Sequence, residues 1–440
     1  MSASSSPTIT ATVIEGFDRY TEDELCRTSS TLQEQPNYDG SCYKFTPKHR
    51  LSSKNNPLCG ICFGQWISIL IERHREIEWA TYWPRLIVIT LLSCVNSALA
   101  FPDWLLYKTK VDQAVLHPRP VFIIGHPRTG TTLLHSLLAL DTDQFAICNT
   151  FCSGFPSCFL WFERFGKVLF SGVMDDHRPM DNVKLHFDLP QEDEIATNVL
   201  CGGTSPYMPL FFMRQEPSFR PYFGFRDDAQ GDEFMPPLLL AHARKRWTDA
   251  FLLLLRRLTV RACEQNPTAR PPRLLLKSPV HTARIPLLLS LFPDAQFVYI
   301  HRNPYDVFRS AAHMADTTYW YTYLNTPTDA MIQEFILRQF EILWQRYENG
   351  RKLLRPDQLI EVSFDDLSTR PLETVQAIYS HFSWNWAGIE TQLQSELSNV
   401  KAHVRNLNTP LPPALRQIVE QRWGDSFDRL GYSRYEEGLK

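Results

Sequence analysis

Residues 121–135, which read VFIIGHPRTGTTLLH, decide the fold of this chain. The apolar run 121–124 predicts a short buried strand that ends at Gly125. Gly125 and Gly130 let the backbone turn tightly, so that successive N–H groups point at one anion. A helix expected over 131–141 adds the positive end of its dipole. The spacing G-x-x-x-x-G-T-T therefore predicts a phosphate-binding loop between a strand and a helix.

This loop lacks the lysine that ATP-hydrolysing loops use. Thr131 stands at that position, and the strand expected over 297–300 runs into His301-Arg302 rather than into an aspartate that could hold magnesium. The loop is therefore expected to bind an anionic group other than a magnesium-bound triphosphate, with Arg128 covering it. A P-loop kinase or NTPase stays open as an alternative.

Basic residues follow two further predicted strands. Lys277 comes directly after the apolar run 274–276, and Arg302 follows 297–300. The carboxyl ends of parallel strands are where ligands of open α/β sheets bind, so both cations are expected beside the loop. Ser310, eight residues after Arg302, would lie early in the next helix and help to hold a phosphate.

The rest of the chain fits the same fold class. A helix expected over 280–291 separates the strands 274–276 and 297–300, which predicts a parallel crossover. Further expectations are an amphipathic helix over 247–263, irregular structure with short helices over 151–235, a strand over 359–364 and a helix over 371–381. The fold class is therefore α/β with a central parallel sheet, in a domain spanning 115–440.

The N-terminal part divides into two segments. Residues 1–57 are polar and are predicted to be disordered. Residues 58–114 are predicted to form a helical extension, with an amphipathic helix over 66–83 followed by the uncharged run LIVITLLSCVNSALAF at 86–101. A bilayer span needs about 20 apolar residues. A buried helix, an in-plane membrane helix and a short span all remain open for this run.

Composition excludes several classes of partner. The formal net charge of −3 provides no basic field to recruit nucleic acid. Among ten cysteines, Cys59 and Cys62 alone form a C-x-x-C pair, so no zinc or other metal site is expected. The N-terminus has no apolar signal-peptide core, which favours the cytoplasm, with membrane association on the cytosolic side as an option.

Three motifs together resemble a known family. PRTGTT at 127–132, LLKSP at 275–279 and HRNPYDVFRS at 301–310 are similar to the PAPS-dependent sulfotransferases, where PAPS is 3′-phosphoadenosine-5′-phosphosulfate. With VSFDDLSTRPLETVQAIY at 362–379, the chain looks most like the group that contains bacterial lipid and quinol sulfotransferases. The resemblance implies a P-loop-like three-layer core, PAPS as co-substrate, and no metal.

The resemblance also implies roles for individual residues. Arg128 would contact the 5′-phosphosulfate, Lys277 would be a second cation near the sulfuryl group, and Arg302 and Ser310 would hold the 3′-phosphate. The loop residues that would cradle the 5′-phosphosulfate are Thr129, Gly130, Thr131 and Thr132.

The sequence departs from the family in two places. Cytosolic members carry a catalytic histidine directly after the K-[ST] pair, where this chain has Pro279, and the nearest histidine is His281. The R-K-G segment that closes over the cofactor is also missing. Its expected substitutes are Lys401, His403 and Arg405.

A different general base is therefore expected. The segment HFDLPQEDE at 186–194 resembles an acidic segment of the lipid-type members. Glu192 is the first candidate, with Glu194 and His186 as rivals. Carboxylates after a proline also stabilise a helix start without any catalytic role, and that alternative remains open.

The acceptor is indicated by composition alone. Aromatic residues are frequent in 151–170 and 207–213, and together with the apolar N-terminal helices they favour a lipophilic hydroxyl acceptor such as a sterol, a quinol or a hydroxylated lipid. Peripheral membrane contact through 58–101 is an accompanying expectation. A non-catalytic nucleotide-binding or membrane scaffold protein is the alternative from another class.

Overall fold

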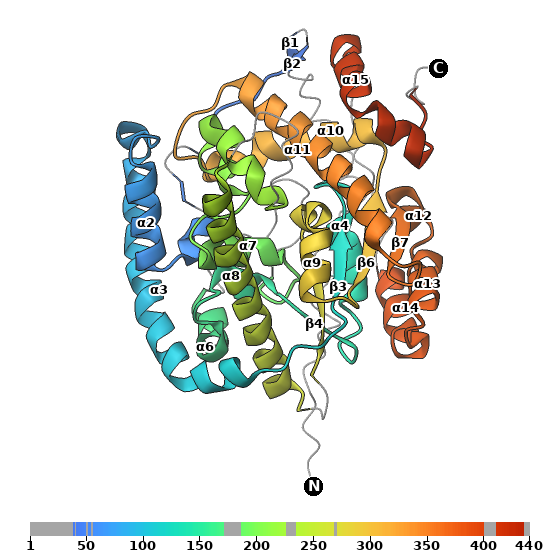
Figure 1. The fold of residues 1–440 in the computed structure, drawn as a ribbon, viewed down its shortest axis with the longest axis horizontal. Helices are drawn as coiled ribbons and strands as arrows, with labels where there is room; N and C mark the ends of the chain where they lie inside the picture. The colour runs from blue at the N-terminus through green and yellow to red at the C-terminus, as the bar shows by residue number, and fades with distance from the viewer. Residues whose placement is uncertain are drawn as a thin grey trace, which may run out of the picture.

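A five-stranded parallel sheet forms the centre of the protein (Figure 1). The computed structural model describes residues 38–39, 41–49, 52–53, 56–170, 186–225, 235–267, 271–399 and 411–434. The strand order is β4-β5-β3-β6-β7, so β3 lies in the middle with β5 and β6 on either side. The strands are β3 (Val121–Ile124), β4 (Phe145–Ile147), β5 (Arg273–Lys277), β6 (Gln296–His301) and β7 (Leu359–Ser363).

Helices cover both faces of this sheet, because each strand alternates its side chains between two cores. Phe122 and Ile124 face a core that includes Trp247 of α8. Val121 and Ile123 face the opposite core, with Leu134 of α4. The chain therefore has the three-layer α/β architecture with a central parallel sheet that the sequence predicts.

The helical elements follow the strands in the usual alternation. They are α2 (Phe63–Arg73), α3 (Trp79–Gln113), α4 (Thr131–Leu138), α5 (Thr150–Gly154), α6 (Phe159–Phe170), α7 (Asp193–Leu200), α8 (Pro237–Gln265), α9 (Ile285–Leu291), α10 (Pro304–Thr318), α11 (Asp329–Gly350), α12 (Phe364–Thr369), α13 (Pro371–Phe382), α14 (Glu390–Asn399) and α15 (Pro413–Leu430), with short 3₁₀ turns η3 (Pro57–Gly60), η4 (Met208–Leu210), η5 (Met213–Phe223), η6 (Pro279–Ala283), η7 (Tyr319–Tyr321), η8 (Arg351–Leu353) and η9 (Trp386–Gly388).

Two expected elements differ from those observed, and one observed strand was not expected. The helix expected over 280–291 is split into η6 and α9 around Arg284, because Pro286 has no N–H to donate to the carbonyl of Thr282 and its ring disfavours a helix that continues through it. The helix expected over 66–83 is two helices, α2 and α3, separated by residues 74–78. Strand β4 was not predicted, since three residues are too few for a periodic pattern.

The segment before residue 58 is ordered in part. The hairpin of β1 (Tyr38–Asp39) and β2 (Cys42–Tyr43) leads to Phe45, which is buried and donates its N–H to Asp329 Oδ1 at 3.2 Å. Part of the segment that was predicted to be disordered is therefore ordered, because the buried side chain of Phe45 and its bond to Asp329 hold this stretch on α11. Residues 1–37 lie outside the described residues, as do Lys401, His403 and Arg405.

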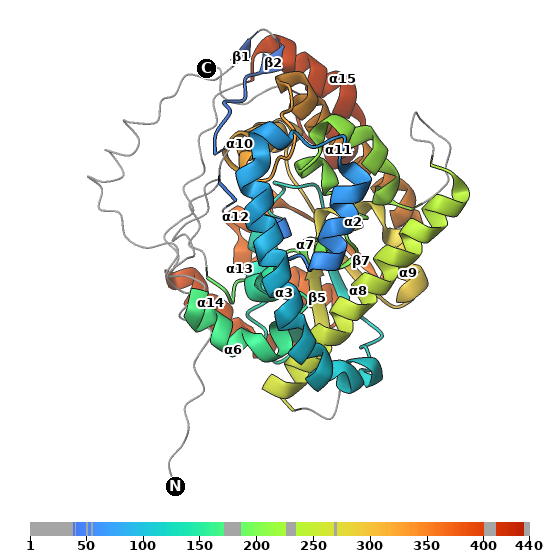
Figure 2. The ribbon, with the colours of Figure 1, turned by 90° about the vertical axis from the view of Figure 1, so that its left-hand side faces the viewer.

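The predicted extension over 58–114 contains η3, α2 and α3. Figure 2 shows α3 running along one side of the molecule, beside α2 and across α6 and α8. It thus packs against helices of the α/β core.

Candidate active site

The phosphate-binding loop joins β3 to α4 and needs glycine at two positions. Gly125 has φ +147°, and a Cβ there would lie 2.4 Å from the carbonyl oxygen of Ile300 on β6. Gly130 has φ +96°, and a Cβ there would lie 2.3 Å from the ring of Phe364. The loop is therefore wedged between the neighbouring strand and α12, and a side chain at either glycine would push it out of place.

Arg128 connects the loop to the second basic motif. Its φ is +73°, a left-handed conformation that costs energy in a residue other than glycine and that is concentrated at functional sites. Its Nε donates to Ser310 Oγ at 2.9 Å, and its carbonyl oxygen accepts from Arg302 Nη1 at 3.5 Å. The predicted convergence of Arg128, Arg302 and Ser310 is thus present in the fold.

The guanidinium of Arg302 is held by two further groups. Its Cζ lies 4.6 Å from the ring centroid of Phe364, and its Nε lies 3.6 Å from Asp306 Oδ2. Asp306 also accepts from Arg309 Nη2 at 2.7 Å, while Asn303 supplies the helix cap by accepting from the N–H of Tyr305. Arg302 is therefore oriented at the start of α10, beside the loop.

The threonines of the loop differ in what their hydroxyls do. Thr129 Oγ1 donates to the carbonyl of His126 at 2.7 Å, and the N–H of Thr129 donates to the same carbonyl at 3.3 Å, so both groups of Thr129 close the turn. Thr131 is buried, whereas Thr132 accepts from Lys277 Nζ at 3.5 Å. Thr282 was not anticipated: its hydroxyl accepts from the N–H of Gly125 at 2.8 Å and fixes the start of the loop.

A second group of polar side chains lies at the end of β5. Lys277 Nζ donates to Glu192 Oε1 at 2.8 Å, with the lysine side chain 2% exposed and the glutamate 20% exposed. Tyr207 donates its hydroxyl to the other oxygen of Glu192 and lies 3.4 Å from Ser278 Oγ. We call Lys277, Glu192, Tyr207 and Ser278 the Lys277 cluster. It adjoins the phosphate-binding loop through Thr132.

Tyr207 is a functional candidate that sequence reasoning placed only among lining aromatics. Burial, and then the neighbouring carboxylate of Glu192, raise the pKa of the Tyr207 phenol well above its ordinary value. The phenol is therefore a hydrogen-bond donor at neutral pH. Its segment, GGTSPYMP, carries no recognisable motif, so only the folded chain brings it to Glu192.

Backbone pairing brings Glu192 to this edge of the sheet. The N–H of Gln191 donates to the carbonyl of Cys148 at 2.8 Å, and the N–H of Thr150 donates to the carbonyl of Leu189 at 2.9 Å. These bonds extend the β4 side of the sheet with the segment before α7. Glu192 is then the residue that precedes α7, so its carboxylate emerges at the carboxyl ends of the strands.

Glu194 occupies a different environment, although it is two residues from Glu192. It is completely buried and pairs with Arg284 Nη1 at 2.6 Å. Ser205 Oγ and Trp247 Nε1 donate to the same carboxylate at 2.6 and 3.1 Å. These three donors fix Glu194 inside the core, so its contacts are those of a structural ion pair and not of the Lys277 cluster.

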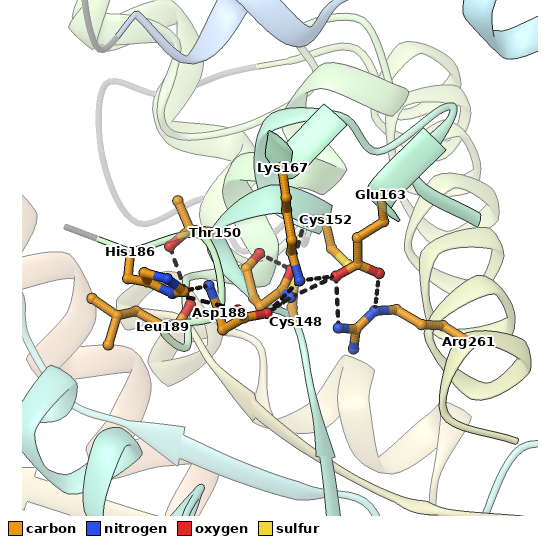
Figure 3. A network of polar contacts seen from close by, with 10 residues as sticks. Cys148, Thr150, Cys152, Glu163, Lys167, His186, Asp188, Leu189 and Arg261 are labelled. Atoms are coloured by element: carbon orange, nitrogen blue, oxygen red, sulfur yellow. Dashed lines mark hydrogen bonds and ion pairs between the residues drawn. The ribbon is translucent and has the colours of Figure 1, made fainter. Parts of the chain in front are cut away.

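His186 lies in another network, shown in Figure 3. There its Nδ1 is 3.4 Å from Asp188 Oδ2, and Lys167 links Asp188 to Glu163. Burial acts to raise the pKa of Glu163, but Arg261, at 2.6 Å, and Lys167 hold that pKa at about 2. The network therefore joins α6 and α8 as a set of ion pairs, and it does not include the Lys277 cluster.

His281, the nearest histidine to the usual catalytic position, is also turned into the core. Its Nε2 lies 2.6 Å from Asp193 Oδ2, and both side chains are fully buried. Of the acid–base candidates named from the sequence, Glu192 is the one whose carboxylate contacts Lys277.

The fold and the site together define a class of protein. A phosphate-binding loop without its lysine, flanked by Lys277 and Arg302 at the ends of the two neighbouring strands, is typical of a P-loop-like α/β fold that binds an anionic group. The chain belongs to the sulfotransferase family, whose model matches residues 120–388. It is an enzyme of the sulfotransferase class.

Similar proteins agree with this assignment. The chain is 30% identical over 380 residues to the omega-hydroxy-beta-dihydromenaquinone-9 sulfotransferase Stf3 of Mycobacterium bovis and to that of Mycobacterium tuberculosis, covering 86% of this chain and 91% of each relative. Among solved structures, sulfotransferase STF1 from Mycobacterium tuberculosis H37Rv matches with a TM-score of 0.56 and 18% identity, over 93% of this chain and all of that chain (100%). Sulfotransferase STF9 from Mycobacterium avium matches with a TM-score of 0.54 and 16% identity, over 79% of this chain and 86% of that one. The two structures support the fold.

Proposed function

We propose that this sulfotransferase takes PAPS as its donor and transfers the sulfuryl group to a hydroxyl of a lipophilic acceptor. The observation that carries the proposal is the Lys277 cluster beside the phosphate-binding loop, which places a carboxylate and a cation at one strand end. The relative Stf3 is named for a hydroxylated menaquinone derivative, and this supports an acceptor with a long apolar part and a hydroxyl.

The residues fit an anion of this kind on both sides of the loop. On one side, Arg302 and Ser310 suit the 3′-phosphate, with the Arg302 guanidinium supplying paired donors, and Arg128, bonded to Ser310, connects this pair to the loop. On the other side, the backbone of 130–132, the guanidinium of Arg128 and the ammonium of Lys277 suit the 5′-phosphosulfate. PAPS supplies the activated sulfuryl group when it is bound.

Each residue then has a role in an in-line displacement. Glu192 takes the proton of the acceptor hydroxyl while the acceptor oxygen bonds to sulfur. Arg128 and Lys277 stabilise the negative charge on the bridging oxygen as its bond to sulfur breaks, which leaves adenosine 3′,5′-bisphosphate. Tyr207 orients Glu192 through its hydrogen bond. Positioning and charge stabilisation dominate reactions of this type.

The alternatives drawn from the sequence gain no support. A P-loop kinase or NTPase would need the lysine that Thr131 replaces, and the family assignment is to sulfotransferases. A non-catalytic scaffold would have no use for the Lys277 cluster beside the loop.

Binding of adenosine 3′,5′-bisphosphate, measured by thermal shift, tests the donor. We expect the bisphosphate to raise the melting temperature of the wild type and to lose most of this effect in Arg302→Ala, because the variant lacks the guanidinium expected at the 3′-phosphate. ATP with Mg²⁺ is the control ligand. A shift with ATP and magnesium, and none with the bisphosphate, would refute the proposal and return the chain to the kinase alternative.

A transfer assay tests the acceptor class. Radiolabelled sulfate from PAPS should appear on a detergent-solubilised quinone carrying a terminal hydroxyl on its isoprenoid chain. A short water-soluble alcohol with the same terminal group is the matched control. Equal rates on both would mean that the apolar part of the acceptor plays no role.

A further inference from the structure

Helix α3 turns polar as well as apolar side chains inward, and the side chains that it turns outward along the uncharged run are mainly apolar. The buried set includes Arg85, Ser93, Asn96 and Asp103. The exposed set consists of large apolar residues on the opposite side of the helix at 100° per residue. Its members include Trp79, Trp83, Ile87, Leu91, Val95 and Leu105. A surface helix of a soluble protein has the reverse arrangement.

The inward polar groups have fixed partners in the protein. Arg85 donates to the backbone carbonyls of His49, Ser52, Trp320 and Tyr323. Asn96 Nδ2 donates to the carbonyls of Cys59 and Ile61 at 2.7 and 3.1 Å. Specific hydrogen bonds to the protein therefore satisfy the polar groups of the inward face, so these groups do not require α3 to be surrounded by water.

Two anchors determine how α3 lies on the body of the protein. Arg85 binds the carbonyls near its start, and Asp103 Oδ1 accepts from Arg257 of α8 at 2.7 Å near its end. These anchors are about five helical turns apart, which is roughly 27 Å along the axis. A helix fixed at both points lies parallel to the surface of the domain, so it cannot cross a bilayer while the domain stays in water.

The apolar surface extends beyond α3. Phe165, Val168 and Leu169 are exposed on α6, and Leu238 and Leu239 are exposed at the start of α8, two helices that α3 contacts (Figure 2). We call the exposed apolar side chains of α2, α3, α6 and the start of α8 the α3 face. Large exposed apolar side chains on α3 and on the helices that it contacts exceed the single apolar residues of ordinary surfaces.

The details of the α3 face fit a lipid surface. Trp79 and Trp83 stand near one end of the uncharged run and Trp104 near the other, where tryptophan prefers the boundary between headgroups and acyl chains. Between α2 and α3 lies a hollow of about 270 Å³ lined by apolar side chains and Thr90, including Leu70 and Leu91, which suits an acyl chain. No charged residue interrupts the run from 86 to 101.

The same face adjoins a second cavity, of about 320 Å³, between α2 and α8. Leu239 and Met208 line it together with charged residues such as Glu72, Arg73 and Arg246. Met208 follows Tyr207, which binds Glu192 in the Lys277 cluster. A lipophilic acceptor leaving a bilayer at the α3 face would thus be close to the residues that receive its hydroxyl.

We propose that the α3 face docks on a phospholipid bilayer, with α3 lying in the plane of the membrane, and that the acceptor reaches the enzyme from that bilayer. The part concerning the acceptor rests on the proposed function, whereas docking itself does not. Lys108 pairs with Asp112, and Lys110 pairs with Glu264 at 2.6 Å, so the end of α3 has little unbalanced positive charge. Docking is therefore driven by apolar burial and does not require anionic lipid.

Co-sedimentation with sucrose-loaded phosphatidylcholine vesicles tests docking without any assay of activity. The variants are the double substitution Ile87→Glu/Leu91→Glu and the control Leu353→Glu, whose leucine is exposed to a similar degree, at 57% against 50% and 62%, but lies on η8. We expect the wild type and the control to bind alike and the double variant to bind at least about tenfold more weakly. Addition of phosphatidylglycerol or of about 0.5 M salt should have little effect on the affinity of the wild type for vesicles.

Two further measurements make the outcome decisive. Light scattering after size-exclusion chromatography tests whether the α3 face binds a second copy of the protein instead of a bilayer. The proposal would be overturned if the wild type were a dimer that did not bind vesicles and if the double variant were a monomer. The thermal shift with adenosine 3′,5′-bisphosphate should be the same in all three proteins. If the wild type binds vesicles but not the bisphosphate, the proposed function is wrong and docking still stands. If the wild type binds the bisphosphate but does not sediment with vesicles, docking is wrong and the proposed function still stands.

Discussion

The carboxyl edge of the sheet and helix α3 both bury charged side chains, but they satisfy them in different ways. At the edge, Lys277 pairs with the side chain of Glu192, which a ligand can displace. On α3, Arg85 is held by four backbone carbonyls, and it remains a cation although burial lowers its pKa to about 10. Burial of a charge therefore does not identify a functional site. The type of partner separates a replaceable contact from a permanent one.

The two carboxylates of the acidic segment give the largest expected effect. Glu192→Gln should lower kcat by about 10²–10⁴-fold, because the amide cannot accept the acceptor proton. Glu194→Gln is the matched control on the same segment. It weakens the buried pair with Arg284, so it should lower the free energy of unfolding by about 3–5 kcal/mol while the activity per folded molecule is kept.

Steady-state kinetics and chemical denaturation on both variants check this contrast. The bisphosphate thermal shift should be retained in Glu192→Gln, which shows that the donor site is intact. If folded Glu194→Gln lost most of its kcat while Glu192→Gln stayed close to wild type, Glu194 would be the general base and Glu192 would not. The distinction between replaceable and permanent partners would then be wrong.

A substitution on α3 tests whether its buried ion pair has a purely structural role. Asp103→Asn leaves Arg257 buried without its counter-charge, so we expect a loss of about 3 kcal/mol in the free energy of unfolding. Bisphosphate binding by the protein that remains folded should be unchanged. Urea denaturation followed by far-UV circular dichroism measures the first quantity. A bisphosphate affinity that falls with stability would mean that α3 supports the donor site directly.

Acid should destabilise the region at the carboxyl edge of the sheet, because two buried histidines lie at the phosphate-binding loop. Burial lowers the pKa of His126 and of His135 to about 3. Above pH 6.5 both imidazoles are neutral in the folded and the unfolded chain. Below it the unfolded chain takes up protons first, so stability is lost as the pH falls from 6.5 toward 3. At pH 5 the loss is about 2 kcal/mol for each imidazole.

His126→Asn isolates one of these contributions. The amide can still donate to the carbonyl of Pro127, which accepts from the imidazole Nδ1 at 2.7 Å, but it does not titrate. The difference in the free energy of unfolding between pH 7 and pH 5 should be smaller in the variant by about 2 kcal/mol. An unchanged difference would show that His126 is protonated in the folded protein at pH 5.

Most of the fold follows from local patterns. The strand-glycine-helix run 121–135 and the apolar runs before Lys277 and Arg302 each encode a buried strand with a turn at its end, so the parallel sheet could be predicted. Strand β4 was not predicted, because three residues are too few to show a periodic pattern of apolar residues. The break between η6 and α9 was not predicted, because proline is also tolerated in the first turn of a helix and the residue pattern does not show where that turn begins.

The site was predicted in part for a related reason. The basic residues lie at strand ends, whose relative positions a parallel sheet fixes, and their convergence follows from topology. Tyr207 and Thr282 lie on irregular segments, which have no periodicity to place them. The sequence also could not separate Glu192 from Glu194, because both carboxylates are equally compatible with a helix start.

The sequence by itself thus determined the phosphate-binding loop, the parallel sheet and the family, since these depend on residue types at fixed short spacings. Only the tertiary structure decided which carboxylate meets Lys277 and which way α3 turns its uncharged run. Both answers depend on contacts between residues far apart in the chain: Lys277 with Glu192, and Arg257 with Asp103. Local patterns restrict the backbone, but the partner of a buried charge is set by packing, which the sequence pattern does not contain.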